Sequence, residues 1–134
     1  MIHYAHRFHG RSSLRFVYQK GYVVRGQHIV LRYARNPRTG TYRMAVVVSR
    51  KVSKSAVVRN RIRRRIFEIV RQRAGQISGP YDLVFNVYDE SIATIEHNAL
   101  KRAVVGVLKK ARVLVSGSPP ALDNGIVEPK EKTV

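Results

Sequence analysis

The chain has 134 residues, 44% of them apolar, so it is about one domain long and has enough apolar side chains for a modest core. Its 26 lysines and arginines outnumber 8 acids and give a net charge of +18, which predicts a phosphate-rich partner, either nucleic acid or an anionic membrane. The absence of cysteine excludes disulfides, cysteine-ligated zinc and thiol catalysis.

The two ends of the chain differ from its middle. Residues 1–9 read as an N-terminal arm without the apolar stretch of a signal peptide, and no run approaches the roughly 20 apolar residues that span a bilayer. We therefore expect a cytoplasmic protein with no membrane partner. Residues 117–134 contain paired prolines, two glycines and no apolar period, which predicts a disordered tail. Residues 10–116 are expected to form a single domain.

The first elements in chain order are a short helix and two strands. The stretch "SSLRFVYQKG" has apolar residues at helical spacing and stops at Gly21, which predicts the helix. The stretches "HIVLRYAR" and "TYRMAVVVS" are β-branched, apolar runs typical of strands. The intervening "NPRTG" contains Pro37 and Gly40, so we expect the two strands to pair as a hairpin.

The segment "VVRNRIRRRIFEIVR", Val57–Arg71, predicts the next helix, which has six arginines and one acid, Glu68. At roughly 100° per residue its apolar stripe consists of Val58, Ile62, Ile66, Ile69 and Val70. The opposite side carries Asn60, Arg61, Arg64 and Arg71. Ordinary surface helices alternate charges to gain local pairing, whereas this side is almost wholly cationic. Because guanidinium groups bind phosphate in a bidentate manner, it predicts a nucleic-acid-binding surface.

A strand and a helix complete the predicted order. The run "YDLVFNVY" predicts the strand, and "SIATIEHNALKRAVVGVLKKARVLV" predicts a long helix that Asp89 and Ser91 cap. The expected apolar face of that helix consists of Ile92, Ile95, Ala99, Ala103 and Val107. The order of helix, two or three strands, helix, strand and helix predicts an α/β or α+β fold, in which helices cover a single sheet of about four strands.

RNA is favoured over DNA as the partner. The chain lacks the turn between two adjacent helices that DNA-binding helical motifs use. RNA-binding domains more often combine a sheet or cleft with aromatic side chains that stack on unpaired bases. Aromatic side chains expected beside the sheet are Phe16, Tyr18, Tyr33 and Tyr42, although each is more often a core residue than a stacking platform.

The run "VVVSRKVSKSAVVRNRIRRRIFEIVR" resembles the signature of the protein subunit of bacterial ribonuclease P, in which a strand and a serine-lysine turn precede an Arg-Asn-Arg helix. The similarity extends to "RFHGRSSLRFVYQKG", "YDLVFNVY" and "SIATIEHNALKRAVVGVLKKA", and so covers about residues 7–112. The resemblance implies a left-handed crossover between parallel strands around the arginine helix. It also implies an endoribonuclease subunit that joins the catalytic ribonuclease P RNA to remove the 5′ leader from precursor tRNA.

The same resemblance implies roles for individual residues. The RNA and its bound magnesium ions would perform the chemistry, so the protein is expected to have no catalytic residue and no metal site, and to be inactive alone. The candidates for a cleft that holds the leader are Leu14, Phe16, Tyr18 and Tyr33. The RNA-binding candidates are Ser49, Arg50, Lys51, Lys54, Arg59, Asn60, Arg61, Arg63, Arg64 and Arg71.

Two other functions fit part of the sequence. His3, His6 and His9 have a spacing that could hold a metal ion for a protein-only nuclease. Three-residue steps drift around a helix and no carboxylate lies nearby, so we do not expect such a site; His28 and His97 are expected at isolated positions. A ribosomal protein or RNA chaperone without a catalytic partner would share the charge, the tail and the arginine helix, and it is the alternative function.

Overall fold

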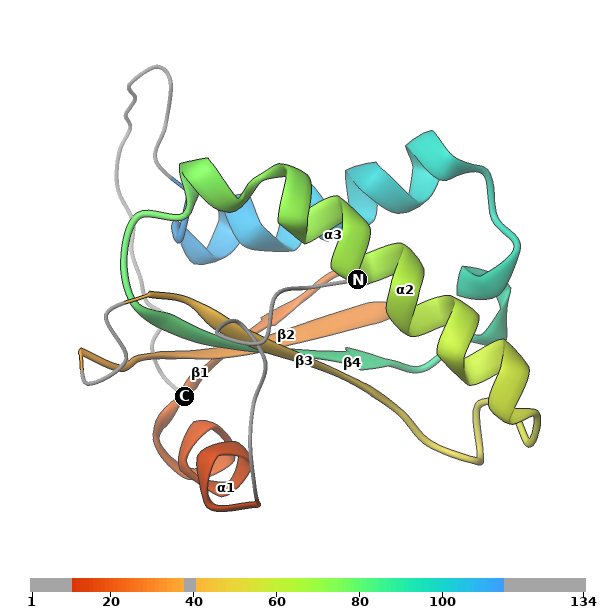
Figure 1. Cartoon of the computed structure of the whole chain (residues 1–134), viewed down its shortest axis with the longest axis horizontal. Helices are drawn as coiled ribbons and strands as arrows, with labels where there is room; N and C mark the ends of the chain where they lie inside the picture. The colour runs from red at the N-terminus through yellow and green to blue at the C-terminus, as the bar shows by residue number, and fades with distance from the viewer. Residues whose placement is uncertain (1–10, 38–40, 115–134) are drawn as a thin grey trace.

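The computed structural model describes residues 11–37 and 41–114, with side chains described from Leu14 onward. The predicted arm at 1–9 and the predicted tail at 117–134 lie outside these residues. The elements are α1 (Arg11–Lys20), β1 (Tyr22–Arg25), β2 (Ile29–Arg35), β3 (Arg43–Val48), α2 (Ala56–Gln72), β4 (Tyr81–Val87) and α3 (His97–Ala111), with short 3₁₀ helices η2 (Ala74–Gln76) and η3 (Glu90–Ala93) (Figure 1). The predicted α+β fold and the order of its elements are confirmed.

The four strands form one mixed sheet in the order β1-β2-β4-β3. β1 and β2 are an antiparallel pair, β2 is antiparallel to β4, and β3 is parallel to β4. The predicted hairpin between the second and third strands is therefore wrong, because β4 lies between them. Six consecutive residues of β4, Asp82 to Val87, are buried, as befits a central strand covered on both faces.

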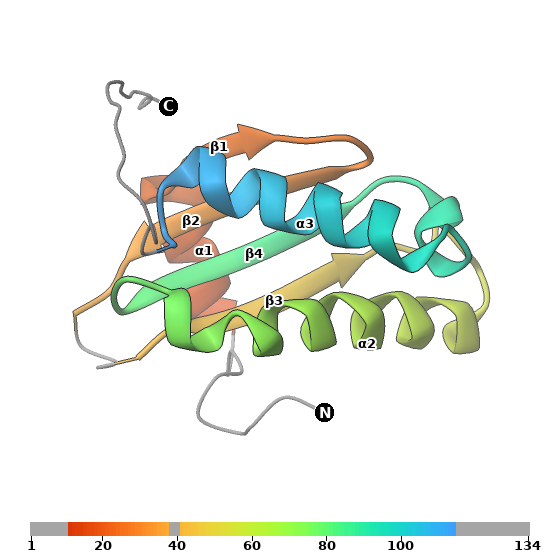
Figure 2. The ribbon, with the colours of Figure 1, turned by 90° about the horizontal axis from the view of Figure 1, so that it is seen from above.

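The connection from β3 through α2 to β4 is a left-handed crossover. Figure 2 looks onto the sheet from the helix side, with β3 and β4 both running to the right and α2 returning to the left in front of them. In this view α2 is lowest, and β3, β4 and β2 follow above it in that order. Crossovers between parallel strands are right-handed in about 98% of cases, so this arrangement is rare. It agrees with the crossover that the family resemblance implied.

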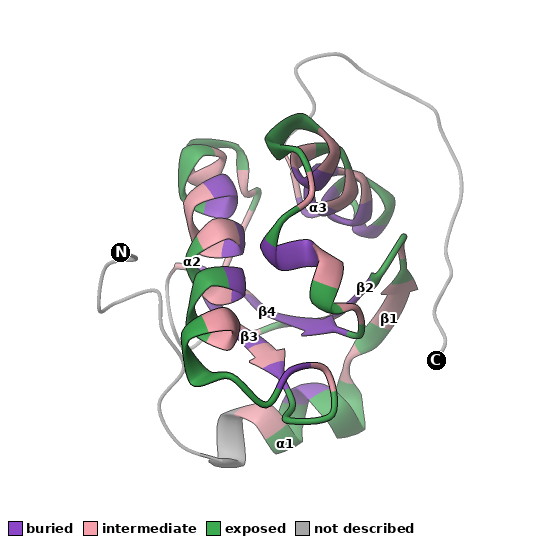
Figure 3. Ribbon diagram, turned by 90° about the vertical axis from the view of Figure 1, so that its right-hand side faces the viewer, coloured by how far each residue is buried: buried purple, intermediate pink, exposed green. Residues whose placement is uncertain are grey.

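Helices cover both faces of the sheet. α2 and α3 lie side by side on one face and α1 lies on the other (Figure 1, Figure 3). The larger core fills the first face, where Ile62 and Ile66 of α2 and Leu100 of α3 pack with Leu83 and Phe85 of β4. A smaller cluster on the second face joins Val17 of α1 to Ala34 and Val84, with Leu14 and Val47 packed against it.

α2 follows its prediction closely. Ser55 caps the helix because its hydroxyl accepts a hydrogen bond from the Val58 backbone nitrogen. Four of the five residues in the predicted apolar stripe are buried, and Val58, the fifth, is partly buried. Figure 3 shows these buried positions turned inward and the exposed ones turned to solvent.

The final helix starts later than predicted. Asp89 caps η3, where its carboxylate accepts from the Ser91 nitrogen, and Glu96 caps α3, where its carboxylate accepts from the Ala99 nitrogen. These two separate caps divide the predicted helix into η3 and α3. Of the predicted apolar face only Val107 is confirmed on α3, since Ile92 and Ile95 precede the helix, while Ala99 and Ala103 are only partly buried. The buried face of α3 consists of Leu100, Val104, Val105, Val107, Leu108 and Ala111.

Candidate nucleic-acid interface

The outer side of α2 presents the cations that the helical wheel predicted. Asn60, Arg61, Arg64 and Arg71 are all exposed, on the side opposite buried Ile62 and Ile66. Neither Arg61 nor Arg64 forms a hydrogen bond or an ion pair with any residue in the described part of the chain. Their guanidinium groups are therefore available to bind anions. We name the exposed set of Asn60, Arg61, Arg64 and Arg71 the arginine ridge.

The other arginines of α2 contact the protein itself. Arg65 donates through Nη1 and Nη2 to the carbonyl oxygens of Ile92 and Ile95, at 2.7 and 2.6 Å. Arg59 is partly buried and donates through Nη1 to the Ser53 carbonyl at 2.9 Å. Arg65 thus ties α2 to the start of the last helix, a structural role that the sequence did not indicate.

Arg63 and Arg71 are each engaged by a neighbour on α2. Arg63 Nη1 donates to Asn60 Oδ1 at 2.8 Å, so these two candidates form a pair. Arg71 forms an ion pair with Glu68, one turn earlier. The hydrogen bond between them lowers the pKa of Glu68 and raises the pKa of Arg71. Arg71 therefore presents a smaller net positive field than Arg61 or Arg64.

The loop between β3 and α2 places four further candidates beside the ridge. Ser49, Arg50, Lys51 and Lys54 are all exposed. The loop is fixed from within, because the Ser49 carbonyl accepts from the Val52 nitrogen at 3.1 Å and the buried Ser53 hydroxyl accepts from the Ser55 nitrogen at 3.2 Å. The Arg59 bond to Ser53 then attaches the loop to α2, so the loop cations extend the arginine ridge at its N-terminal end.

The structure separates the four leader-cleft candidates. Phe16 and Tyr18 of α1 are each 41% exposed, and Leu14 is partly buried in the smaller cluster. Tyr33 points to the opposite face of the sheet, because side chains alternate along β2. There its ring lies 5.5 Å from the Tyr22 ring and its pKa is raised, first by burial and then by neighbouring tyrosines.

Arg32 and Asn86, which the sequence analysis did not select, lie beside Tyr18 on the α1 face. Asn86 Nδ2 donates to the Tyr18 hydroxyl at 2.8 Å, and the Arg32 guanidinium carbon lies 4.9 Å from the centre of the Tyr18 ring. Arg32 Nε and Asn86 Oδ1 are buried without a hydrogen-bond partner. Since buried polar atoms are usually paired, these two are unsatisfied polar groups beside Tyr18. The sequence signal that could have identified Arg32 and Asn86 is a polar residue inside an otherwise apolar strand.

The acid nearest to this face is already neutralised. Asp82 is fully buried, and its carboxylate accepts two hydrogen bonds from Arg43, each 3.0 Å, and one from Asn36 at 2.9 Å. A bidentate arginine pair with a third donor compensates a buried carboxylate for lost hydration. Asp82 is therefore a structural ion pair that holds β3 to β4.

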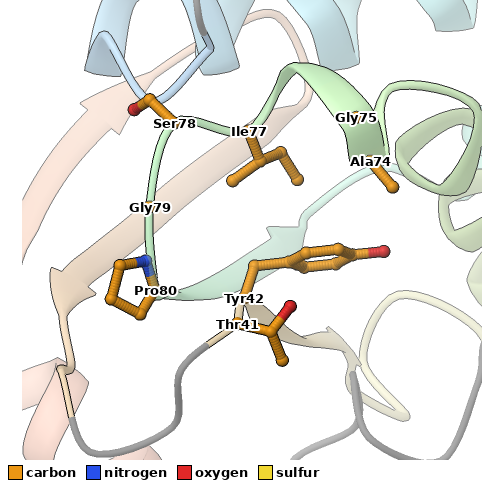
Figure 4. Close-up of a pocket in the computed structure, with 8 residues that line it drawn as sticks. All are labelled: Thr41, Tyr42, Ala74, Gly75, Ile77, Ser78, Gly79 and Pro80. Carbon is orange, nitrogen blue, oxygen red and sulfur yellow. The ribbon is translucent and has the colours of Figure 1, made fainter.

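A mostly apolar hollow and a histidine–aspartate pair lie outside the surfaces described above. A hollow of about 430 Å³ lies where β3 begins and η2 leads to β4, and its lining is mostly small or apolar, including Tyr42, Ile77 and Pro80 (Figure 4). Tyr42 is buried, as a core aromatic. His28, expected to be isolated, instead lies 2.8 Å from Asp89, measured from Nδ1 to Oδ2.

The metal-site hypothesis concerns residues outside the described part. His3, His6 and His9 precede residue 11, so the structure does not describe them. Among residues 11–37 and 41–114, no group of three or more histidine, aspartate or glutamate side chains is placed to hold a metal ion. No helix within the same ranges is long and apolar enough to cross a membrane.

A cationic helix and loop on a four-stranded mixed sheet define a small, basic α+β domain of nucleic-acid-binding type. Residues 2–112 match the family model described as Ribonuclease P, and the chain belongs to that family. It is 32% identical over 114 residues to the ribonuclease P protein component of a Pseudanabaena species, covering 85% of this chain and 97% of the relative. The corresponding protein of a Synechococcus species is 33% identical over 119 residues, with 87% and 89% covered.

Solved structures agree with this fold. The Staphylococcus aureus RNase P protein matches with a TM-score of 0.73 at 24% identity, covering 81% of this chain and 97% of that protein. The Thermotoga maritima RNase P protein matches with a TM-score of 0.70 at 22% identity, covering 78% and 96%. Family membership makes the chain a component of an RNA-processing ribonuclease. The comparisons give no support to the alternative of a ribosomal protein or RNA chaperone.

Proposed function

We propose that this chain binds the ribonuclease P RNA and the 5′ leader of precursor tRNA, and so assists endonucleolytic removal of that leader. The observation that carries the proposal is the pair of exposed arginines, Arg61 and Arg64, that form no hydrogen bond or ion pair with any described residue of their own chain. Phosphates of a structured RNA would supply the anions that this surface lacks. Each arginine that contacts a phosphate releases counterions from the RNA, which favours assembly.

In this proposal the arginine ridge and the loop cations bind the catalytic RNA. The candidates are Ser49, Arg50, Lys51, Lys54, Arg59, Asn60, Arg61, Arg63, Arg64 and Arg71. These candidates differ in how many of their donors are already used by contacts within the protein. Arg61, Arg64 and the loop cations donate to no residue in the described part of the chain, whereas Arg59 already donates to Ser53 and Arg71 is paired with Glu68.

The α1 face is proposed to hold the single-stranded leader. Phe16 and Tyr18 offer exposed aromatic rings on which unpaired bases can stack. Arg32, whose guanidinium carbon lies 4.9 Å from the centre of the Tyr18 ring, adds a positive charge that favours the leader backbone there. Tyr33 faces away from this surface, so we propose no leader contact for it.

We propose that the RNA and its magnesium ions supply the catalytic groups, and that the protein binds and orients the substrate. Four of the five acids in residues 11–37 and 41–114 already have structural partners. Glu68 pairs with Arg71, Asp82 with Arg43, Asp89 accepts from Ser91, and Glu96 caps α3. Only Glu90 remains, and one carboxylate is a poor starting point for two-metal phosphoryl chemistry.

Cleavage assays on precursor tRNA test this division of labour. Purified protein free of RNA is expected to cleave nothing in magnesium, and addition of a ribonuclease P RNA is expected to produce the mature 5′ end. Robust cleavage by the RNA-free protein would contradict the proposal. The RNA that co-purifies with the chain from its host provides a second test, because stoichiometric ribosomal RNA would favour the alternative function.

A further inference from the structure

A second cationic surface lies between the end of α2 and the outer side of α3, and none of the contacts proposed above uses it. It is a groove of about 540 Å³ lined by Arg73 from the end of α2 and by Lys101, Arg102 and Lys109 from α3, among others. Asn98 also lines it, whereas no acid does. The groove is on the side of α3 opposite Leu100, Val104 and Leu108, which face the sheet.

The cations of this groove lack counterions among residues 11–37 and 41–114. None of the four forms an ion pair with a described acid, and the one hydrogen bond among their side chains joins Arg73 Nη1 to Gln76 Oε1 at 3.4 Å. Four like charges around one groove repel one another, and a bound anion relieves that repulsion. The lining therefore has the composition of an anion site.

Gly106 indicates that the groove is kept open. Glycine is unfavourable in the middle of a helix, and packing does not require one here, because a Cβ added at Gly106 would meet no atom within 4 Å. The missing side chain lowers the wall of the groove, so a ligand can approach the α3 backbone. Val105, on the same side of α3, is 8% exposed and forms part of the floor.

The length of the groove indicates the kind of anion. From Asn98 to Lys109 the lining extends for roughly 16 Å along α3, at 1.5 Å per residue. Four cations spread over that distance suit a run of phosphates better than a single small ion. Lysine and arginine together, with one amide, are also the side chains that most often contact nucleic-acid backbone.

We propose that this groove binds a second stretch of RNA phosphate backbone, distinct from the stretch bound by the arginine ridge. The inference rests on the proposed function only in taking RNA as the partner. The protein then contacts two segments of RNA on the face of the sheet that α2 and α3 cover, one along the outer side of α2 and one between α2 and α3. The leader, on the α1 face, is a third contact.

A charge-matched pair of double variants tests the proposal. Arg102→Gln with Lys109→Gln removes two cations from the groove, and Arg25→Gln with Lys110→Gln removes two exposed cations outside it. Each double variant takes one lysine from the last turn of α3, so effects on the helix dipole are equal. The measurement is the slope of log K against log salt for binding to ribonuclease P RNA.

The groove variant is expected to have a slope shallower by roughly 1.4 to 1.8, at 0.7 to 0.9 per lost phosphate contact, and the control variant is expected to match the parent. Equal changes in both variants, or no change in the groove variant, would overturn the proposal. Gly106→Leu blocks the groove without changing charge and is expected to weaken RNA binding at fixed salt. Parent-like affinity in that variant, with the fold intact by circular dichroism, would also overturn it.

Inorganic phosphate distinguishes an RNA site from a site for a free anion. If phosphate raises the melting temperature of the parent more than that of the groove variant while the RNA salt slope is unchanged, the groove binds only small anions and the proposal fails. The Arg61→Ala, Arg64→Ala variant is measured in parallel. Loss of RNA contacts in the groove variant alone would leave this proposal standing and overturn the ridge assignment.

The absence of cysteine allows the two RNA segments to be mapped directly. A single cysteine at the groove (Asn98→Cys) or at the ridge (Arg61→Cys) can carry a tethered hydroxyl-radical source, with Arg25→Cys as the control. We expect the groove and ridge probes to cleave different stretches of the ribonuclease P RNA. Cleavage of one common stretch from both positions, or cleavage from the groove no stronger than from the control, would contradict a second segment.

Discussion

Arginines of one helix have different roles according to what their guanidinium groups contact. Arg65 donates to two carbonyls of the η3–α3 junction, and Arg59 donates to one in the preceding loop. Arg61 and Arg64 are the two ridge residues that form no hydrogen bond or ion pair within the described chain. The same residue type therefore fastens the fold at one position and presents charge to a partner at the next.

The first prediction compares Arg61→Ala, Arg64→Ala with Arg65→Ala. The double variant should keep the parent's melting temperature, since alanine is a good helix former, and its RNA salt slope should be shallower by roughly 0.7 to 0.9 per lost contact. Arg65→Ala should cost about 1.5 to 3 kcal/mol of stability, typical of hydrogen bonds to a charged group. Circular dichroism melts and salt-dependent affinities decide between them. Unfolding of the double variant with an unchanged slope would make the ridge structural.

The sequence could not have assigned these roles individually. The wheel separates the buried from the exposed side of α2, so it predicted Arg61 and Arg64 correctly as outward. The partners of Arg65 lie 27 and 30 residues further along the chain, and they meet it only after η3 and α3 have packed on α2. For the same reason Arg32 and Asn86 were missed, because their common neighbour Tyr18 belongs to a distant helix.

The ionisation of Asp89 should make the stability of the fold depend on pH in the acid range. The Ser91 hydrogen bonds, and secondarily the nearby His28, lower the pKa of Asp89 below its ordinary value of about 3.9. A lowered pKa in the folded state means that ionised Asp89 favours folding above its ordinary pKa, and that this contribution is lost as pH falls through the lowered value. The melting temperature of the parent should exceed that of Asp89→Asn near pH 6, and the difference should shrink below about pH 4. A difference independent of pH would contradict the assignment.

Among the elements, α2 could be predicted from local sequence and the strand pairing could not. Helical periodicity is a property of neighbouring residues, and it predicted Val57–Arg71 where the helix is Ala56–Gln72. The partner of β3 is β4, whose Asp82 comes 39 residues after Arg43. Two successive apolar runs with a turn between them favour a hairpin by proximity, but β4, buried on both faces, takes the central place instead.

Alanine substitutions on the buried side of α2 should lower stability and leave RNA affinity unchanged, the reverse of substitutions on its exposed side. Ile62 and Ile66 are fully buried against the sheet. Each change to alanine should cost about 2 to 5 kcal/mol, the usual range for truncating a buried aliphatic side chain. RNA affinity per folded molecule should stay at the parent value. Denaturant melts with binding corrected for the folded fraction test this, and a pure loss of affinity in a fully stable Ile62→Ala variant would contradict the packing.

The whole molecule combines a net charge of +18 with cationic surfaces over α2 and α3. Such a charge opposes compaction, whereas an anion that binds only the folded state stabilises it by mass action. We therefore expect the melting temperature to rise with sulfate concentration, by an amount that corresponds to about 2.7 kcal/mol at a hundred times the dissociation constant. Sodium chloride at equal ionic strength is the control. Equal responses to the two salts would indicate screening alone, without a preformed anion site.

The central position of β4 has a consequence during protein synthesis. β2 and β3 each keep an unpaired edge until β4 emerges, and Asp82 follows its partner Arg43 by 39 residues. At bacterial or eukaryotic elongation rates that interval is roughly 2 to 8 s. Open strand edges of this kind promote association between nascent chains. The excess of positive charge, which helps RNA recognition in the finished protein, also keeps the incomplete chains apart while the last strand is being made.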